Sequence, residues 1–527
     1  MEEDINDEET KFFRSRSKKR KEMIHQTSLD VGWKPFAGII ADIKRRWSKE
    51  SYISDWKDGV IKGNKKKTLS AILFLYFACL APTVAFGGLT NLITDGKMGV
   101  LEFIISCGSS GIIYSLFSGQ PMTFLGPTGL TLAFIAALYR FTAVLNIPFF
   151  CMYAWTGLWT SLFIALSAIF NLSNLLKLCT RFTDDCFNAL LSLNFLYEAS
   201  LSVVRNFYKP EADLVAAFAA TNIALGTWQS TNAVVKLRNS KLFNANIRKY
   251  ISNFGPTIVI LAISIFTSRL TGINIEKLSV PKVFGLAEGR SWFVDLFVVP
   301  MWLRIAAAGP AILLTMLFYL DQNISVRAVN SCEVKKGDAY HLDLLVLSGI
   351  VGVLSILGLP WTCAATVQSM NHVNAMSDFE KDEEGLERRK NIVETRVTGL
   401  AIHSCILGSL FLLPILAQIP LPVVSGIFFY FGNKLTQGNL LLTRLAHIFT
   451  EKKLLRKENI YNNLPHSTVY KFIAIQTLML GLVWTLKQSK KFALFFPSCI
   501  ALLMVTRSFL LPKLFKNSEL QQLDPLL

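Results

Sequence analysis

Charged residues are scarce in this chain. Only 17% of its 527 residues are Asp, Glu, Lys or Arg, whereas 52% are hydrophobic and the mean hydropathy is +0.40. A typical soluble domain carries about 25% charged residues, so the composition argues against a soluble globular enzyme. The alternating pattern of membrane β-strands is also absent. The sequence therefore predicts an all-α polytopic membrane protein that contacts the lipid bilayer along most of its length.

Patterns of catalytic and metal-binding residues are missing as well. The nine cysteines occur singly, the six histidines show no paired ligand spacing, and there is no P-loop or Ser-His-Asp array. We therefore expect no enzymatic activity and no cofactor. The acidic start of the chain, with Glu2, Glu3 and Asp4, is unlike a signal or transit peptide, so the first span is expected to direct insertion.

The net charge of +17 is concentrated near the N-terminus, for example at Lys18 to Lys21 and Lys65 to Lys67. No aromatic and basic binding module accompanies it, so we expect lipid contact and a cytoplasmic anchor, with no nucleic acid partner. Residues 1–33 are predicted to form a disordered cytoplasmic arm. Residues 34–67 carry apolar side chains at helical spacing, which predicts an amphipathic helix on the cytoplasmic surface. A helix packed on the inner face of the protein itself is the equally weighted alternative.

Apolar runs that approach the length of a membrane span begin at Thr68 and recur about fourteen times. Seven lie in residues 68–270, a polar connection follows at 271–290, seven more lie in 291–512, and 513–527 form a cytoplasmic tail. An odd number of spans per half gives the halves opposite orientations, which predicts a 7+7 inverted repeat. An even total places both termini in the cytoplasm.

Two of these runs are broken by glycine and proline. The first break lies in Ser118-Gly-Gln-Pro-Met-Thr-Phe-Leu-Gly-Pro-Thr-Gly-Leu-Thr-Leu132, and the second in Leu357-Gly-Leu-Pro-Trp-Thr-Cys-Ala-Ala-Thr-Val367. Irregular backbone survives in a membrane only where it is buried in protein or lines a wet cavity. Proline suits the first turn of a helix, so each break is expected to open a half-helix whose positive end attracts an anion. Paired breaks predict a transporter site.

Asp321 is a carboxylate in an otherwise apolar helix, where an unpaired charge is expensive. Ser325 lies four residues further on the same helical face, so the two are a candidate pair of oxygen ligands for a small cation. The alternatives are a position at the water interface and an ion pair with Arg327. At the breaks we favour Thr128 and Thr366 for binding, because hydroxyls at a half-helix start supplement the backbone N–H donors.

The chain contains the stretches Leu80-Ala-Pro-Thr-Val-Ala-Phe-Gly-Gly-Leu89, Ser118-Gly-Gln-Pro121, Arg181-Phe-Thr-Asp-Asp185, Leu320-Asp-Gln322, Gly358-Leu-Pro-Trp-Thr-Cys-Ala-Ala-Thr-Val367 and Glu394-Thr-Arg-Val-Thr-Gly399. Together they resemble solute carrier family 4, the bicarbonate and borate transporters. The resemblance implies fourteen spans, a core domain that moves against a gate domain, two half-helices that meet at mid-membrane, and usually a homodimer. The large cytoplasmic N-terminal domain of animal members is expected to be missing, since about 65 residues precede the first span.

Within that family, anion exchangers carry Glu at the position of Asp321 and Arg at the position of Gln368, so the chain is more similar to the sodium-coupled bicarbonate transporters. The resemblance implies a sodium ion, the coupling ion, at Asp321, Ser325, Thr128, Cys363 and Ala364. It implies bicarbonate or carbonate binding by Gln120, Pro127, Thr128, Gly129, Ala364, Ala365, Thr366 and Gln368.

The expected function is thus sodium-coupled transport by alternating access, with sodium-independent chloride/bicarbonate exchange or borate export as alternatives. A receptor or scaffold without transport is a more distant alternative. The plasma membrane is the expected location, and an organelle envelope is the other option.

Overall fold

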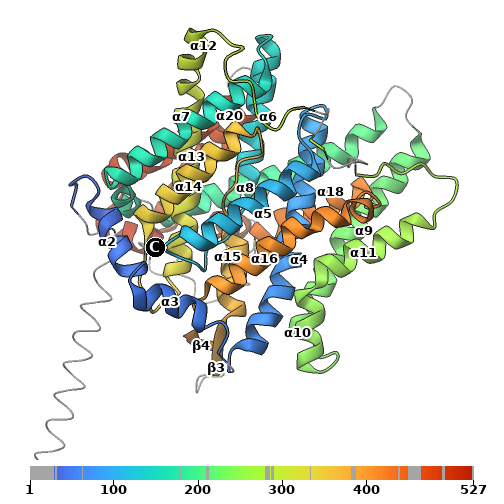
Figure 1. Cartoon of the computed structure of the whole chain (residues 1–527), viewed down its shortest axis with the longest axis horizontal. Helices are drawn as coiled ribbons and strands as arrows, with labels where there is room; N and C mark the ends of the chain where they lie inside the picture. The colour runs from blue at the N-terminus through green and yellow to red at the C-terminus, as the bar shows by residue number, and fades with distance from the viewer. Residues whose placement is uncertain are drawn as a thin grey trace, which may run out of the picture.

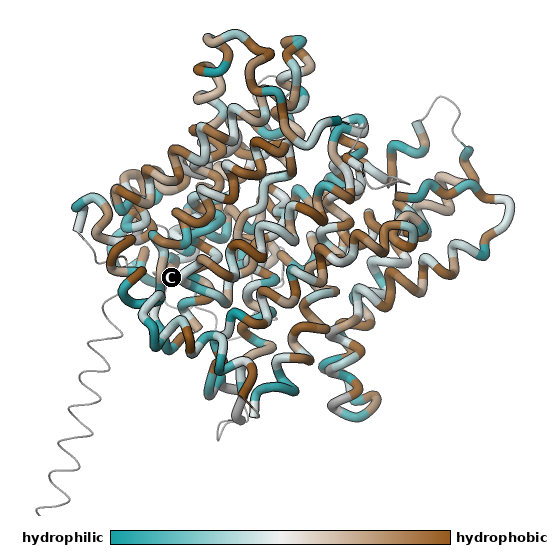
Figure 2. Tube along the Cα trace, viewed as in Figure 1, coloured by the Kyte–Doolittle hydropathy of each residue, from teal (hydrophilic) through white to brown (hydrophobic). Residues whose placement is uncertain are grey.

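The computed structural model of the chain describes residues 29, 32–61, 63–178, 180–208, 213–278, 285–286, 290–332, 334–381, 387–436, 439–448, 464–489 and 493–524. Nearly all of the expected arm at 1–33 therefore lies outside the described residues. The rest is a bundle of helices, with the most polar segments in loops and at helix ends (Figures 1 and 2).

The first half begins with two short helices and continues with longer apolar ones. Its elements are α2 (Ala37–Arg46), α3 (Lys49–Lys57), α4 (Lys65–Ile93), α5 (Val100–Phe117), β1 (Leu125–Gly126), α6 (Gly129–Val144), α7 (Phe149–Ile169), α8 (Arg181–Val204), α9 (Leu214–Lys236), α10 (Ala245–Asn253) and α11 (Gly255–Ser268).

The second half has the same sequence of long helices around a short strand. Its elements are α12 (Met301–Ala306), α13 (Ala308–Asn330), α14 (Tyr340–Ile356), β2 (Cys363–Ala364), α15 (Thr366–Ala375), the hairpin β3 (Ser377–Lys381) and β4 (Glu387–Ile392), α16 (Arg396–Gly408), α17 (Leu413–Leu416), α18 (Leu421–Thr436), α19 (Leu440–Ile448), α20 (His466–Gln488), α21 (Phe496–Val505), α22 (Leu511–Leu514) and α23 (Asn517–Leu523).

Seven helices within the described ranges are long and apolar enough to span a membrane, and α6, α11 and α14 are shorter apolar helices. The two breaks fall where the sequence predicts them, each between a long helix and a shorter one. The all-α polytopic fold expected from composition and run length is thereby confirmed.

The helices pack crosswise between the two halves. Helix α7 packs against α13 and α14, and α16 packs against α4 and α5. If the halves are matched in chain order, α4 corresponds to α13, α5 to α14 and α7 to α16, so each packing arrangement is the counterpart of the other. This reciprocity is what an inverted repeat requires, because a pseudo-two-fold axis exchanges the halves.

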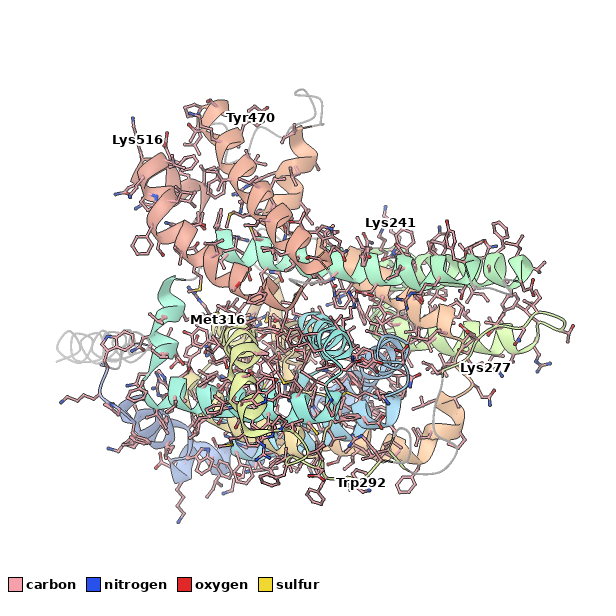
Figure 3. The ribbon with its side chains drawn as sticks, turned by 90° about the horizontal axis from the view of Figure 1, so that it is seen from above. Lys241, Lys277, Trp292, Met316, Tyr470 and Lys516 are labelled. Atoms are coloured by element: carbon pink, nitrogen blue, oxygen red, sulfur yellow. The ribbon has the colours of Figure 1, made fainter. Side chains whose placement is uncertain are left out.

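The helices form two groups. In one, α4 to α7 pack with α13 to α16, and in the other, α8, α9 and α11 pack with α18, α20 and α21. Figure 3 separates the groups from above: Met316 of α13 lies in the first group, whereas Tyr470 of α20 and Lys241 lie over the second. These are the core and gate domains of the fold, and α4, α6 and α13 contact both.

Close helix packing depends on small residues, as it does in membrane proteins generally. Gly426 of α18 approaches α9 so closely that a Cβ there would lie 2.5 Å from the Ala224 carbonyl oxygen. Gly157 of α7 faces Ser355 of α14, and an added Cβ would lie 2.7 Å from the indole Nε1 of Trp361.

Helix α2 packs on the protein through one face. Ile39, Asp42 and Arg46 of that face are buried. The Asp42 carboxylate accepts hydrogen bonds from the backbone N–H groups of His341 and Leu342, 2.9 and 3.1 Å away, in the first turn of α14. Burial raises the pKa of Asp42 well above its ordinary value, and the hydrogen bond from Leu342 opposes that rise.

Gly157→Ala is expected to destabilise the protein by about 1–3 kcal/mol, because the new methyl group has no room between α7 and α14. Gly226 in α9 is the matched control, since a Cβ there meets nothing within 4 Å. Thermal unfolding of detergent-solubilised protein, followed by the loss of the monodisperse chromatographic peak, measures both variants. Equal melting temperatures for the two variants would contradict the tight α7–α14 contact.

Candidate functional site

The two breaks meet inside the core. Strands β1 and β2 pair antiparallel, with Leu125 opposite Ala364 and Gly126 opposite Cys363. The Ala365 N–H donates to the Phe124 carbonyl at 2.8 Å, which extends the pairing by one bond. Helices α6 and α15 then begin at Gly129 and Thr366. Their N-termini therefore start from the same short ladder.

Buried side chains from distant elements form hydrogen bonds with the irregular backbone of the first break. Asp343 of α14 accepts hydrogen bonds from the N–H groups of Gly119 and Gln120, at 2.7 and 3.2 Å. The Ser369 hydroxyl accepts from the Phe124 N–H at 2.9 Å, and His372 Nδ1 lies 3.0 Å from the Met122 carbonyl, to which it donates. Such partners allow non-helical backbone inside a membrane protein.

A tight turn and an arginine fix the start of the second break. Gly358 adopts φ +59°, a conformation that favours glycine. Arg290, from the segment between the two halves, donates to the carbonyl oxygens of Leu357 and Gly358 at 3.1 and 2.8 Å.

Both half-helix starts leave positive partial charge at the junction. The Thr128 hydroxyl caps α6 weakly, with its oxygen 3.4 Å from the Thr131 N–H. Helix α15 has no side-chain cap at Ala365. The first N–H groups of a helix have no intrahelical acceptors, and the helix dipole makes this end attractive to anions.

Helix α13 places a carboxylate against this junction. Asp321 is only 5% exposed, and its Oδ2 atom has no hydrogen-bond partner among the described residues. The Thr128 hydroxyl lies beside the carboxyl group. The protein therefore shields the Asp321 carboxylate from solvent. Arg327, the alternative ion-pair partner, donates to the Leu176 carbonyl at 3.3 Å.

Ser325 lies on the same face of α13, one turn beyond Asp321. Its hydroxyl is 2.5 Å from Thr366 Oγ1 and 3.2 Å from the Ala364 carbonyl oxygen. A carboxylate, hydroxyls and a backbone carbonyl therefore converge where β2 leads into α15. Oxygen ligands of this kind suit a hard cation. Groups of three or more His, Cys, Asp or Glu that would suit a transition metal do not occur in the described ranges.

The gate domain closes the other side of the junction. The Asn194 amide of α8 donates to the Gly129 carbonyl at 3.2 Å. A Cβ at Gly129 would lie 3.0 Å from the Phe195 ring, so a side chain there would require the ring to shift. The ring of Phe195 packs against Phe86 of α4 and Phe428 of α18, with centroids 5.8 and 5.5 Å apart.

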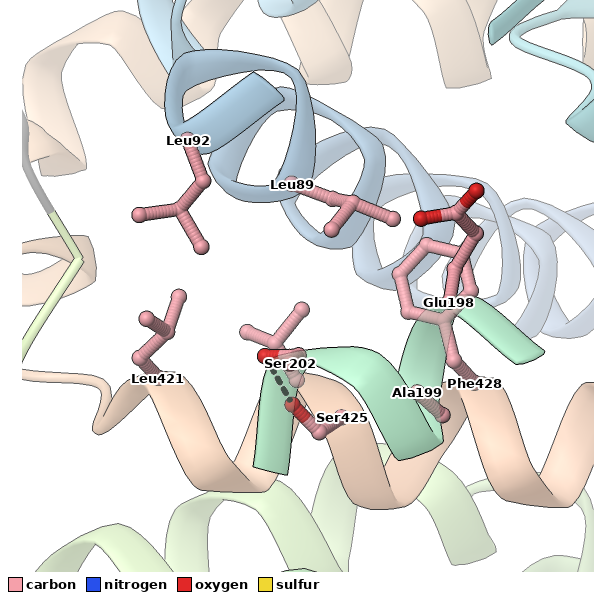
Figure 4. Close-up of a pocket in the computed structure, with 9 residues that line it drawn as sticks. Leu89, Leu92, Glu198, Ala199, Ser202, Leu421, Ser425 and Phe428 are labelled. Carbon is pink, nitrogen blue, oxygen red and sulfur yellow. Dashed lines mark hydrogen bonds between the residues drawn. The ribbon is translucent and has the colours of Figure 1, made fainter. Parts of the chain in front are cut away.

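A small pocket lies beyond these rings, between α4, α8 and α18 (Figure 4). Leu89, Leu92 and Phe428 line it together with Glu198, and the Ser425 hydroxyl is 3.0 Å from Ser202 Oγ. A wider hollow next to it shares Ser202, Leu421 and Ser425.

The structure brings most of the predicted site residues together. Gathered at or next to the junction are Pro127, Thr128, Gly129, Asp321, Ser325, Cys363, Ala364, Ala365 and Thr366. Gln368 is half-buried in the first turn of α15. Gln120 lies at the start of the first break, and its side-chain amide donates a hydrogen bond to Asn330 Oδ1 at 2.8 Å. The roles given to these residues stay predictions.

Gln322 is a residue that the sequence analysis missed. Its Oε1 accepts from the Ala364 N–H at 3.2 Å, and its Nε2 donates to the Tyr114 hydroxyl at 3.0 Å. It thus ties β2 to α13 and α5. The Leu320-Asp-Gln322 motif contained the signal, because a buried amide beside a buried carboxylate also needs partners.

Comparisons with known proteins agree with this architecture. The family model described as the HCO3- transporter integral membrane domain matches residues 34–217 and 208–527. The chain is 32% identical to the Band 3 anion transport protein of Mus musculus over 516 residues, which is 93% of this chain and 55% of that protein. It is also 32% identical to the sodium-driven chloride bicarbonate exchanger of Rattus norvegicus over 568 residues, 93% of this chain and 50% of that protein.

Solved structures show the same fold at low sequence identity. The transmembrane domain of the cyanobacterial bicarbonate transporter BicA aligns with a TM-score of 0.58 and 14% identity, covering 83% of this chain and 97% of that one. The structure of SLC26A9 aligns with a TM-score of 0.57 and 12% identity, covering 90% of this chain and 69% of that one.

The chain spans about half the length of the curated relatives it matches. Those relatives are named as anion transporters and exchangers, and neither is an enzyme. The resemblance drawn from the motifs is confirmed by the family match along almost the whole chain. The chain belongs to the bicarbonate transporter family, solute carrier family 4, and forms that family's integral membrane domain.

Proposed function

We propose that the chain carries bicarbonate or carbonate across the membrane together with sodium, by alternating access of the junction between the core and gate domains. The observation that supports this most strongly is the buried carboxylate of Asp321 beside two half-helix N-termini, whose Oδ2 atom has no hydrogen-bond partner among the described residues. An ionised carboxylate without a cationic partner is costly in this environment, so a bound cation offsets that cost.

The charges at the junction explain why a cation and an anion would bind together. The two helix N-termini attract an anion, but Asp321 repels it unless a cation lies between them. In the proposed site Thr128, Asp321, Ser325 and the Ala364 carbonyl hold sodium, with Cys363 beside them. The N–H groups of Thr366 and Gln368 face the anion, and Thr128, Gly129, Ala364 and Ala365 form its other side. Gln120 and Pro127 shape the approach.

Alternating access would act on the Phe86, Phe195 and Phe428 rings, which belong to both domains. Movement of α4 relative to α8 and α18 would part these rings and connect the junction with the hollow beyond them. We further propose a homodimer in the plasma membrane with both termini in the cytoplasm. The repeats would span residues 68–270 and 291–512.

Sodium-independent chloride/bicarbonate exchange is the second candidate. It is favoured by the equal identity of the chain to Band 3 and to the sodium-driven exchanger. In that case Asp321 would bind a proton or serve the structure alone. Gln368 argues for the first candidate, because its amide supplies no fixed positive charge to replace sodium. Borate export ranks third.

Asp321→Asn is expected to lower sodium-dependent bicarbonate uptake by about tenfold or more, since the loss of one charged ligand costs about 1.5–3 kcal/mol. Uptake of labelled bicarbonate into vesicles, with sodium present or replaced by an inert cation at fixed chloride, measures this. Asp95→Asn is the matched control, because Asp95 lies in the loop after α4 and accepts a hydrogen bond from Tyr139 at 2.8 Å. Sodium-dependent uptake by the Asp321→Asn variant at the control level would contradict the site.

Gln368→Arg is expected to reduce the sodium requirement, because a fixed guanidinium beside the α15 N-terminus replaces part of the cation's charge. Uptake at zero sodium should rise while uptake at saturating sodium changes little or falls. Gln368→Met, similar in length and uncharged, separates the effect of charge from that of side-chain size. If both variants show the same sodium dependence as the parent chain, the electrostatic explanation of coupling is wrong.

A further inference from the structure

Helix α2 and the two residues that flank it carry an apolar face that the described part of the chain covers only in part. Phe36, Ile40, Ile43 and Trp47 follow one another at intervals of four, three and four residues, and each residue is 38–51% exposed. At 100° per residue these positions lie within a narrow sector of the helix. We call these four residues the α2 stripe.

The opposite side of α2 is fixed to the core domain by polar contacts. Asp42 caps the N-terminus of α14, and the Gly38 N–H donates to Asn171 Oδ1 at 3.0 Å. Arg46 is fully buried; its Nε donates to the Gly119 carbonyl at 2.5 Å and its Nη1 donates to Glu394 at 2.9 Å. The stripe therefore cannot turn inward without breaking this buried network.

The stripe adjoins an exposed apolar face of α7, a helix long and apolar enough to span a membrane. Leu162 and Leu166 of α7 and Phe170 at its C-cap, spaced four residues apart, are 38–47% exposed. The Phe36 N–H donates to the Ile169 carbonyl at 2.8 Å, so the stripe begins where this face of α7 ends. Figure 1 shows α2 beside the end of α7, at the edge of the bundle.

The charges around the stripe fit anionic headgroups. Lys44 is exposed on α2 itself, and Lys34 and Lys49 are exposed just beyond its ends. Tryptophan at the end of the stripe suits the interfacial layer, and lysine next to an apolar helix face suits anionic lipid.

We propose that the α2 stripe docks on the anionic headgroup layer of the adjoining membrane leaflet and thereby steadies the first break through Arg46 and Gly119. The proposed occupant of the stripe is lipid. The consequence is a link from lipid composition to the segment that leads into β1 and α6.

The docking is tested by a fluorescent probe on the full chain in vesicles of phosphatidylcholine with phosphatidylserine. A polarity-sensitive label is attached at Ile40→Cys, with Cys405, which is exposed, changed to serine and with unmodified parent protein giving the background. Lys57→Cys, exposed on α3 and outside the stripe, is the matched control. We expect lipids spin-labelled near the headgroup to quench the Ile40 probe several-fold more than the Lys57 probe, and aqueous iodide to do the reverse.

Two results would overturn the docking. Strong iodide quenching at position 40 without lipid quenching would mean that the stripe faces water. Protection from both quenchers would mean that protein covers it.

The link to the first break is tested by hydrogen exchange, a readout that does not depend on transport. Peptides covering residues 118–124 should exchange several-fold more slowly in phosphatidylserine vesicles than in pure phosphatidylcholine. Ile40→Gln should remove this difference, and Ile40→Leu should keep it. If these peptides of the parent chain exchange at the same rate in both kinds of vesicle, the coupling is refuted, even if the probe at position 40 contacts lipid.

Discussion

The need to satisfy irregular backbone inside a membrane protein governs this structure. Two breaks open the core helices, and each would leave several unpaired polar groups in an apolar environment. Some of these polar groups are paired because the two breaks form the antiparallel strands β1 and β2. Asp343, Ser369 and His372 supply partners for the first break, and Gln322 supplies one for the second. Much of the packing of α13 to α16 around the junction serves this purpose.

The polar groups at the junction that remain without a partner indicate what the site can bind. The N-terminus of α6, which Thr128 caps only weakly, and that of α15, which has no side-chain cap, leave a positive field, and Asp321 leaves an unsatisfied carboxylate oxygen in the same place. A structural site would pair these charges directly, as Arg46 and Glu394 are paired elsewhere. Opposite unpaired charges at a domain boundary are instead suited to ligands that come and go together.

Sequence patterns predicted the helices and the breaks because both depend on local properties. Run length and hydropathy give the spans, and Gly358 or Pro127 marks where a helix must stop or restart. Asp321 stood out because a lone carboxylate in an apolar run is rare. Contacts between segments far apart in the chain could not be predicted: Asn194 on Gly129, Arg46 on Gly119 and Gln322 on Ala364 join residues 42 to 73 positions apart. The hydrogen bond from the Gln120 amide to Asn330 could not be predicted for the same reason.

Equilibrium binding of radioactive sodium to the purified chain, measured with and without bicarbonate, tests the proposed site most directly. Binding free energies of coupled ligands are reciprocal, so each ion must tighten the other by the same factor. The account predicts that bicarbonate tightens sodium binding, that sodium tightens bicarbonate binding equally, and that Asp321→Asn abolishes both effects. Sodium binding that is indifferent to bicarbonate, or that persists in the Asp321→Asn variant, would contradict it.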